Sequence, residues 1–237
     1  MKLLAFESSA KAASTALFSD GCLLAEYTQN SGQTHSRTLM ELAKNMLSGC
    51  DLTPQDIDAV AVAAGPGSFT GVRIGMACAK GFAWGRQLPL YGVSTMEAMV
   101  RGAACADGVY CACMDARKGQ IYNAVFDWIA GALLRRTEDR AIAISELLQE
   151  LQSMPGPVYL VGDGAKLVFD TLIDENLPLQ LLPEHLRQQR ASGVALAAME
   201  KIAAGEPGDA AALTPNYLRQ AQAERTRQHD KDFYLKK

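Results

Sequence analysis

Hydrophobic and polar positions along the first fifty residues follow two different periods. Short apolar runs at residues 3–6, 15–18 and 23–28, separated by small-residue turns, predict two or three antiparallel strands. From residue 36 to residue 49 the apolar positions recur with the helical period, which predicts a helix with apolar side chains on more than one face. The chain therefore begins as a mixture of sheet and helix.

The remainder of the chain alternates apolar strands with amphipathic helices. The patterns predict strands at residues 59–64, 90–93, 109–114, 120–126, 133–137 and 158–161. They predict helices at residues 72–84, 95–104, 144–151, 167–172 and 194–203. The order of antiparallel strands followed by mixed strands and helices starts a second time near Val109. We therefore expect an α/β protein of two similar halves, the second of them degenerate.

The division into domains follows from this repetition. We expect an N-terminal α/β domain over residues 1–104 and a smaller C-terminal α/β domain over residues 105–219, whose last helix can return to the first domain. Residues 220–237 are charged and poor in apolar anchors, which predicts a disordered tail.

The composition is that of a globular protein with a slightly acidic balance. Of the 237 residues, 49% are hydrophobic and 21% are charged, and the formal net charge is -3. Because free-standing nucleic-acid binders carry a basic surplus, we expect any contact with RNA to need a partner's positive surface. The six cysteines contain no CxxC pair, which favours reduced thiols. No run approaches about 18 apolar residues and no export signal is visible, so we expect a cytoplasmic protein without a membrane segment.

The stretch GPGSFTGVRIG, residues 65–75, lies between a predicted buried strand and a predicted helix. Exposed backbone N–H groups in this context attract anions. The candidate phosphate loop consists of Gly65, Gly67, Ser68 and Gly71. The stretch lacks the Lys-Ser/Thr of a Walker A loop, and its glycines do not form GxGxxG. Close packing of a helix on a strand remains the alternative, because glycines suit that role equally.

Other candidate catalytic or binding residues do not form part of a complete known motif. Glu7 is the only acid near the first turn, where a kinase or ATPase would place a carboxylate for magnesium, and a Glu hydrogen-bonded to the turn explains it equally. His35 lacks a second histidine one helical turn on, because position 39 is Leu, so we expect a solvent-facing histidine and no metal. No serine lies in a G-x-S-x-G elbow. The hairpin tip at residues 115–118 carries one acid and two basic residues, which suit a nucleotide or RNA, but charged hairpin tips are common.

Several of these segments together resemble one protein family. They are LLAFESSAKAASTAL, QTHSRTLMELAKNML, GPGSFTGVRIG, MDARKGQIY and the late LTPNYLR. In combination they are similar to the bacterial TsaB (YeaZ) family, the accessory subunit for threonylcarbamoyladenosine synthesis on tRNA. The resemblance spans about residues 1–219.

The resemblance implies a fold and a set of partners. It implies the duplicated actin-like, Hsp70-like, sugar-kinase-like (ASKHA) fold, a catalytic paralogue TsaD and an ATPase TsaE. In that pathway TsaD transfers threonylcarbamoyl to N6 of the adenosine beside the anticodon, in tRNAs that read codons beginning with A. The catalytic paralogue holds a metal through an HxxxH pair. The stretch beginning at His35 has Leu39 in the second place, so the resemblance implies a non-catalytic subunit without metal or cofactor that meets tRNA through the complex.

The resemblance also implies that helices 36–49 and 72–84 form a four-helix bundle with their equivalents in TsaD. The expected contact residues are Leu39, Met40, Ala43, Met46, Leu47, Ala79, Phe82 and Ala83. The alternative is that all of them pack under the chain's own C-terminal part. The same surface can support a homodimer when the partner is absent.

Two function classes follow, with a third of less weight. The first is a scaffold that binds and supports the catalytic paralogue and helps to form a docking surface for the ATPase and tRNA. The rival is an ATP-dependent kinase or ATPase of the sugar-kinase type that uses Glu7 and the glycine loop. Proteolysis, suggested by a peptidase label in the wider family, has no visible nucleophile elbow, zinc pair or aspartic dyad to support it.

Overall fold

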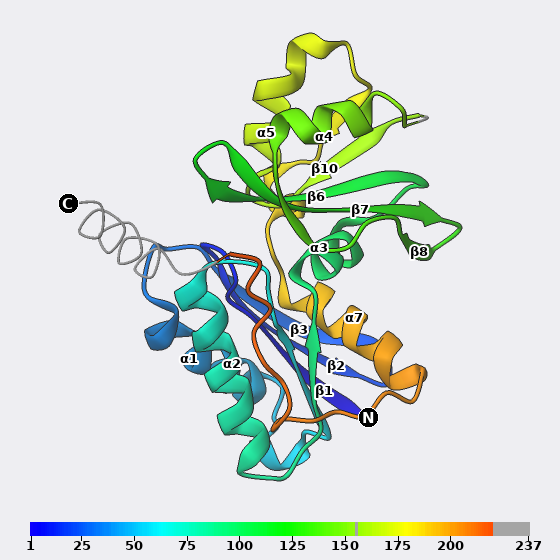
Figure 1. Cartoon of the computed structure of the whole chain (residues 1–237). Coiled ribbons are helices and arrows are strands. Elements are labelled where there is room, and N and C mark those ends of the chain that lie inside the picture. Colours follow the sequence, from blue (N-terminus) through cyan, green and yellow to red (C-terminus); the bar gives the residue numbers. More distant parts are fainter. Residues whose placement is uncertain (155, 220–237) are drawn as a thin grey trace, which may run out of the picture.

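The first half of the chain forms a five-stranded mixed sheet (Figure 1). The structure is a computed structural model, which describes residues 1–154 and 156–219. The strands are β1 (Lys2–Glu7), β2 (Ala13–Ser19), β3 (Cys22–Gln29), β4 (Ala59–Ala63) and β5 (Leu90–Val93), in the order β3-β2-β1-β4-β5. Strands β1, β2 and β3 are antiparallel, whereas β4 and β5 run parallel to β1.

The second half repeats this arrangement in a six-stranded sheet. Its strands are β6 (Gly108–Arg117), β7 (Gln120–Ile129), β8 (Ala132–Arg135), β10 (Val158–Val161) and β11 (Leu179–Leu181), in the order β11-β10-β6-β7-β8. The first three are antiparallel and the last two run parallel to β6, as in the first sheet. The extra strand β9 (Arg140–Ala143) pairs with β7. The two halves therefore share strand order and direction.

Helices cover both faces of each sheet. They are α1 (His35–Gly49), α2 (Phe69–Trp84), α3 (Thr95–Ala103), α4 (Ile144–Leu151), α5 (Ala165–Leu172), α6 (Glu184–Arg187) and α7 (Ala191–Ala203), with 3-10 turns η1 (Pro54–Asp56) and η2 (Ile173–Glu175). Helices α1 and α2 pack on one face of the first sheet, and α7 packs on the other. In the second sheet α4 and α5 cover one face and α3 the other.

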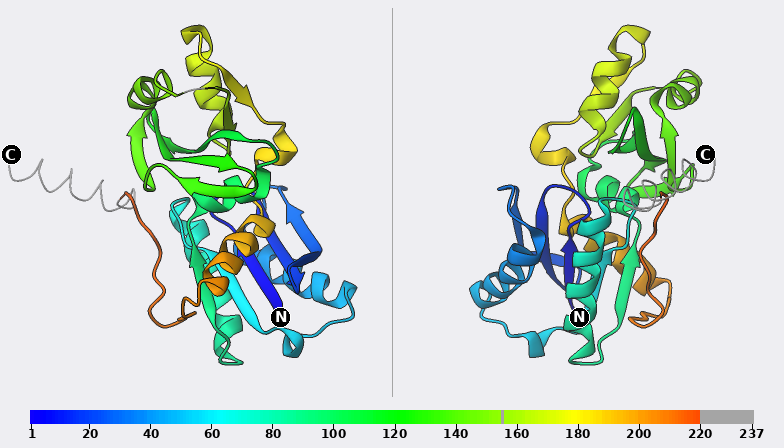
Figure 2. Two further views of the ribbon diagram at one scale, coloured as in Figure 1. Left: turned by 90° about the vertical axis from the view of Figure 1, so that its right-hand side faces the viewer. Right: turned by 60° about the vertical axis from the view of Figure 1, so that its left-hand side comes forward.

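Each of the two helices between the sheets, α3 and α7, packs on the sheet of the other half of the chain (Figure 2). Helix α3 follows the first sheet in sequence but packs on the second, and α7 follows the second sheet but packs on the first. They contact each other closely, because a Cβ at Gly193 would lie 2.0 Å from the carbonyl oxygen of Ala98. Only glycine fits there.

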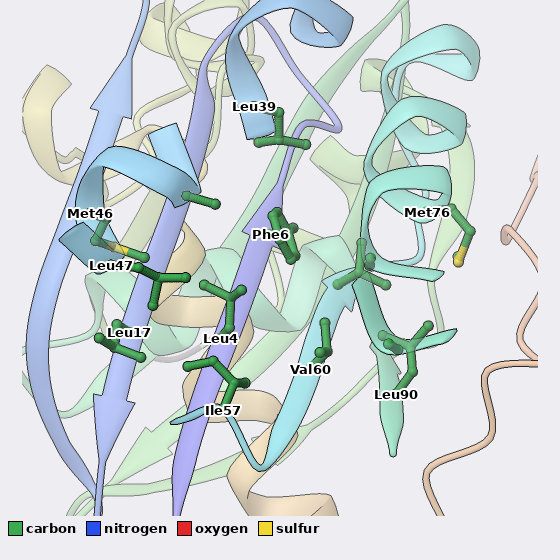
Figure 3. Packing of buried hydrophobic residues seen from close by; sticks show 14 of the residues in the cluster. Leu4, Phe6, Leu17, Leu39, Met46, Leu47, Ile57, Val60, Met76 and Leu90 are labelled. Carbon is green, nitrogen blue, oxygen red and sulfur yellow. The ribbon is translucent and has the colours of Figure 1, made fainter. Parts of the chain in front are cut away.

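The alternation of side chains along β1 explains the two cores of the first half. Leu4 and Phe6 face α1 and α2, and Leu3 and Ala5 face α7. Figure 3 shows side chains of α1 directed onto this sheet, among them Leu39, Met46 and Leu47. A strand that is buried on both faces reads as a continuous apolar run, as the sequence does at this point.

Most predicted elements are present within a few residues of their predicted bounds. Helix α2 begins at Phe69 rather than at residue 72, because the Ser68 hydroxyl caps it by accepting a hydrogen bond from the backbone N–H of Gly71 at 3.3 Å. Strands β9 and β11 and helix α6 were not predicted, since each has only three or four residues and no measurable period. The predicted tail at residues 220–237 lies outside the described residues, and the domain bounds stay a prediction.

Candidate functional site

The glycines of the 65–75 stretch bring α2 onto the turn that follows β1. A Cβ at Gly71 would lie 2.1 Å from the carbonyl oxygen of Ser8, and one at Gly67 would lie 2.7 Å from the Cβ of Ser9. The Ser8 hydroxyl donates a 2.9 Å hydrogen bond to the carbonyl oxygen of Gly71. These glycines therefore permit a backbone approach that no larger residue would allow.

Two of the four backbone N–H donors of the candidate phosphate loop are engaged within the chain. The N–H of Ser68 donates to the carbonyl oxygen of Ser9 at 2.7 Å, and the N–H of Gly71 donates to the Ser68 hydroxyl. The backbone of Gly65 packs closely against Asn216, because a Cβ at Gly65 would lie 2.6 Å from the carbonyl oxygen of Asn216. Phosphate binding at the loop stays a prediction, and these contacts favour the packing role instead.

A cleft of about 330 Å³ lies between the two halves, at the end of the first sheet where the glycine loop stands. Its walls come from the turn after β1, the glycine loop, the hairpin between β6 and β7, the turn after β10 and the C-terminal segment. The lining residues are Ser9, Ala10, Lys11, Pro66, Gly67, Ser68, Phe69, Met114, Asp115, Ala116, Arg117, Tyr122, Asp163, Asn216, Tyr217, Leu218 and Arg219. The hairpin tip predicted from residues 115–118 thus contributes to this cleft.

Two acids with raised pKa values lie at the cleft, the half-buried lining residue Asp163 and the buried Glu7 beside it. Glu7 is 1% exposed; its Oε1 accepts a hydrogen bond from the backbone N–H of Ser9, and its Oε2 has no partner among the described residues. Burial raises the pKa of Glu7 from 4.5 to about 7. Burial also raises the pKa of Asp163, whose Oδ1 accepts a 2.9 Å hydrogen bond from Gln189. Below neutral pH the Glu7 carboxyl is therefore mainly protonated.

His35 does not face solvent, contrary to the expectation from its place before a helix. The side chain is half-buried, and its Nε2 lies 2.8 Å from the carbonyl oxygen of Ala10, to which it donates. The histidine thus fastens the start of α1 to the turn after β1. Leu39, one turn on, is 0% exposed in the core of the first half.

The helix pair α1 and α2 buries six of the eight predicted contact residues in the chain's own core. These six are Leu39, Ala43, Met46, Leu47, Ala79 and Ala83, each no more than 3% exposed. They pack against β1, β2 and β4. The first sheet therefore covers these apolar side chains of the helices, although the sequence pattern had suggested apolar side chains on more than one face of the helix at residues 36–49. Ala210 and Leu213 of the C-terminal part also pack against this cluster, so the alternative, packing under the C-terminal part, describes part of the arrangement. Among the eight, Met40 is 39% exposed and Phe82 is half-buried.

Helix α2 exposes a different stripe, which consists of three small residues, one arginine and a tryptophan at its end. Its exposed residues are Thr70, Arg73, Ala77, Gly81 and Trp84. Trp84 is 82% exposed, and a Cβ placed at Gly81 would find no atom within 4 Å. The spacing of three to four residues was visible in the sequence and could have revealed this stripe.

The C-terminal segment, residues 207–219, returns along the first half and ends at the cleft (Figure 1). The backbone N–H of Asn216 donates to the carbonyl oxygen of Ala64 at 2.7 Å. The Tyr217 ring lies 4.8 Å from the ring of Phe69, centre to centre. Arg219 donates a hydrogen bond to the carbonyl oxygen of Ala116. This segment therefore joins the glycine loop to the hairpin of the second half, a contact that no local pattern indicated.

Comparison with known proteins places these features in a family context. The chain matches the family described as TsaD, tRNA N6-adenosine threonylcarbamoyltransferase, over residues 23–226. The tRNA threonylcarbamoyladenosine biosynthesis protein TsaB of Bacillus subtilis (strain 168) is 32% identical over 227 residues, 94% of this chain and 96% of that protein. The protein of the same name from Escherichia coli (strain K12) is 34% identical over 167 residues, 69% and 72% of the two chains.

Among solved structures, YeaZ from Pseudomonas aeruginosa has a similar fold. It matches with a TM-score of 0.77 at 23% identity, covering 92% of this chain and 99% of that one. The likeness concerns the fold and, with the repeated strand order, confirms the predicted duplicated actin-like, Hsp70-like, sugar-kinase-like architecture. Within residues 1–154 and 156–219, no helix combines the length and hydropathy needed to cross a membrane.

Proposed function

The chain belongs to the TsaB family of tRNA threonylcarbamoyladenosine biosynthesis proteins, and on this premise we propose that it is the non-catalytic scaffold of the modifying complex. Its partner is the catalytic paralogue TsaD, which transfers threonylcarbamoyl to N6 of the adenosine beside the anticodon. The ATPase TsaE joins the pair, and tRNA is bound by the complex rather than by this chain alone.

The observation that carries the proposal is the exposed stripe of α2. Ala77 and Gly81 leave a shallow surface on which a second helix can approach closely. Trp84 at the end of the stripe is a large, rigid side chain of the kind that anchors interfaces when it is buried. An isolated chain gains nothing from exposing it, so a partner surface accounts for it better.

The neighbouring helix widens this surface. Helices α1 and α2 pack side by side on the first sheet, and α1 adds the exposed Met40. The four-helix bundle implied by the family resemblance thus remains the proposed geometry. The residues that it would present are those of the exposed stripe and Met40, in place of the buried six.

The proposal is tested by reconstitution with TsaD, TsaE and tRNA. Leu39→Glu is unsuitable, because it would place a charge in the core and unfold the chain. Ala77→Glu keeps the fold and places a charge on the stripe, with Ala203→Glu on the exposed end of α7 as a matched control. We expect Ala77→Glu to abolish the complex on size exclusion and threonylcarbamoyl transfer, and Ala203→Glu to preserve both. Full assembly and activity of Ala77→Glu would refute the proposed interface.

The rival function, an ATP-dependent kinase or ATPase, is favoured by the cleft and by the buried Glu7 beside it. Isothermal titration of the isolated chain with magnesium-ATP distinguishes the two. Micromolar binding with phosphate release that Glu7→Gln abolishes would support the rival.

Size exclusion with light scattering on the same sample shows whether the chain alone forms a homodimer through the stripe, which Ala77→Glu would then disrupt.

A further inference from the structure

Five basic side chains stand around the mouth of the cleft between the halves. We call them the rim cations: Lys11, Arg73, Arg117, Lys118 and Arg219. Lys11, Arg117 and Arg219 line the cleft itself, and Lys118 follows Arg117 at the exposed hairpin tip. Arg73 reaches the same place from α2, because its Nε donates a 2.7 Å hydrogen bond to the hydroxyl of Tyr217, another lining residue.

The rim cations have no carboxylate partner within the described part of the chain, and they are distinguished from other unpaired basic side chains by their gathering at one cleft. Among the other described basic side chains, seven form ion pairs with Asp or Glu, and the unpaired ones do not line the cleft. The seven are Arg101, Arg135, Arg136, Arg140, Lys166, Arg190 and Lys201. Arg73 instead lies over the ring of Phe69, 3.7 Å from its centre, and Arg219 donates to a backbone carbonyl. In a chain of net charge -3, these cations are therefore free to neutralise an outside anion.

The acids at the cleft do not cancel this charge. Two aspartates, Asp115 and Asp163, line the cleft, against five rim cations, and Asp115 accepts a 2.6 Å hydrogen bond from the backbone N–H of Arg117 within the hairpin turn. Glu7 does not line the cleft, and burial raises its pKa to about 7. The cleft mouth is thus positive on balance.

Aromatic side chains lie among the rim cations. Tyr122 and Tyr217 line the cleft, and Tyr217 is 40% exposed. Alternation of cations with aromatic faces is typical of surfaces that hold a nucleic-acid strand, since the cations neutralise phosphates and the rings stack on bases. An acidic peptide would use the cations but would leave the rings without a role.

We propose that this rim is the surface through which the chain contacts RNA phosphates when it is part of the tRNA-modifying complex. The proposal rests on the function proposed above and adds the place of contact. Arg73 belongs both to the rim and to the exposed stripe of α2, so an RNA on the rim lies beside the partner chain. The partner supplies the remaining binding surface, which reconciles a positive rim with the acidic balance of the whole chain.

The test compares two double variants of equal charge change. Lys11→Gln/Arg117→Gln neutralises exposed rim residues, and Lys166→Gln/Lys201→Gln neutralises two lysines away from the cleft. The binding of a fluorescein-labelled tRNA that reads codons beginning with A is followed by anisotropy, with each double variant assembled with TsaD. The measurement is repeated at several KCl concentrations between about 50 and 200 mM, the range over which phosphate contacts respond to salt.

We expect the rim variant to assemble normally and to bind tRNA about tenfold more weakly, with a salt slope lower by about 2 for the two lost phosphate contacts. The control should match the wild type. Unchanged affinity and slope in the rim variant, or an equal loss in the control, overturns the proposal. Displacement of tRNA by ATP, with ATP binding lost in the rim variant, overturns it in favour of a nucleotide site.

The outcome is separable from that of the proposed function. If the wild-type chain does not assemble with TsaD, the scaffold proposal fails. The same titrations on the full chain alone at about 50 mM KCl then test the rim, because low salt strengthens phosphate contacts enough to make weak binding by one subunit measurable. Weaker binding by the rim variant than by the control supports the rim, and equal binding by the two overturns it.

Discussion

The hydroxyl oxygen of Tyr217 accepts a 2.7 Å hydrogen bond from Nε of Arg73, across 144 positions of the chain. The guanidinium of Arg73 also lies on the ring of Phe69, which packs against the Tyr217 ring at an interplanar angle of 30°. This cluster fixes the C-terminal segment to the first turns of α2, where the exposed stripe meets the cleft. One contact thus connects the proposed partner surface with the proposed RNA surface.

Removal of the Tyr217 ring tests this connection. We expect Tyr217→Ala to lower the free energy of unfolding by about 1 to 2 kcal/mol, because it removes the aromatic contact and the hydrogen bond from a half-exposed site. Tyr217→Phe keeps the ring and should cost less than about 1 kcal/mol. Urea denaturation measures both values. A Tyr217→Ala protein as stable as the wild type would show that the segment is not held by this contact.

The buried Glu7 predicts an unusual pH dependence of stability. Its folded pKa of about 7 lies above its ordinary value of 4.5, so between these values the native state binds more protons than the unfolded state. The contribution to stability is therefore fully present below pH 4.5 and is lost as the pH rises through 7. The loss amounts to about 3 kcal/mol at most.

Glu7→Gln provides the matching variant, because it keeps the shape and cannot ionise. We expect it to exceed the wild type in free energy of unfolding by up to about 3 kcal/mol at pH 8, and to differ by less than about 1 kcal/mol at pH 5. Urea titrations at the two pH values measure the difference. An equal effect of the substitution at both would show that Glu7 does not titrate in this range.

Substitution by alanine should have opposite effects on stability at two glycines of α2, one tightly packed and one exposed. Gly71→Ala would place a Cβ 2.1 Å from a backbone oxygen, whereas Gly81→Ala meets no atom within 4 Å. We expect Gly71→Ala to cost about 3 kcal/mol or more of stability through overpacking. Gly81→Ala should stabilise the isolated chain by about 0.5 to 1 kcal/mol, because alanine is the better helix former. Chemical denaturation checks both; near-equal effects would contradict the assigned packing.

Trp84 gives a direct signal for partner binding. Because it is 82% exposed, we expect Trp84→Phe to leave the stability of the isolated chain within about 0.5 kcal/mol of the wild type. Binding of TsaD should shift the wild-type tryptophan emission to shorter wavelength, and the variant should lack this shift. Trp128, the second tryptophan, is half-buried and serves as an internal reference.

Trp84→Ala extends this prediction to affinity. We expect about a 30-fold weaker complex, the loss that corresponds to truncating an interface anchor worth about 2 kcal/mol. Surface plasmon resonance with immobilised TsaD measures it. An unchanged dissociation constant would remove Trp84 from the proposed interface.

The sequence by itself determined the succession of elements and the family. Apolar runs on strands buried on both faces, such as β4, and the helical period of α1 are local signals, because they depend on the spacing of neighbouring residues. The repetition from Val109 onward likewise predicted the duplicated fold, and the quoted motifs led to the TsaB resemblance that the comparisons confirm.

Only the tertiary structure decided which side chains remain for a partner. The apolar positions of α1 form a stripe whether they meet the chain's own sheet or another protein, so their pattern could not show that Leu39 and Met46 are buried inside. The cleft likewise depends on residues 9–11, 115–117 and 216–219, which are far apart in sequence and meet only after folding. Burial and charge clustering are sums over such distant contacts, and local periodicity carries no information about them.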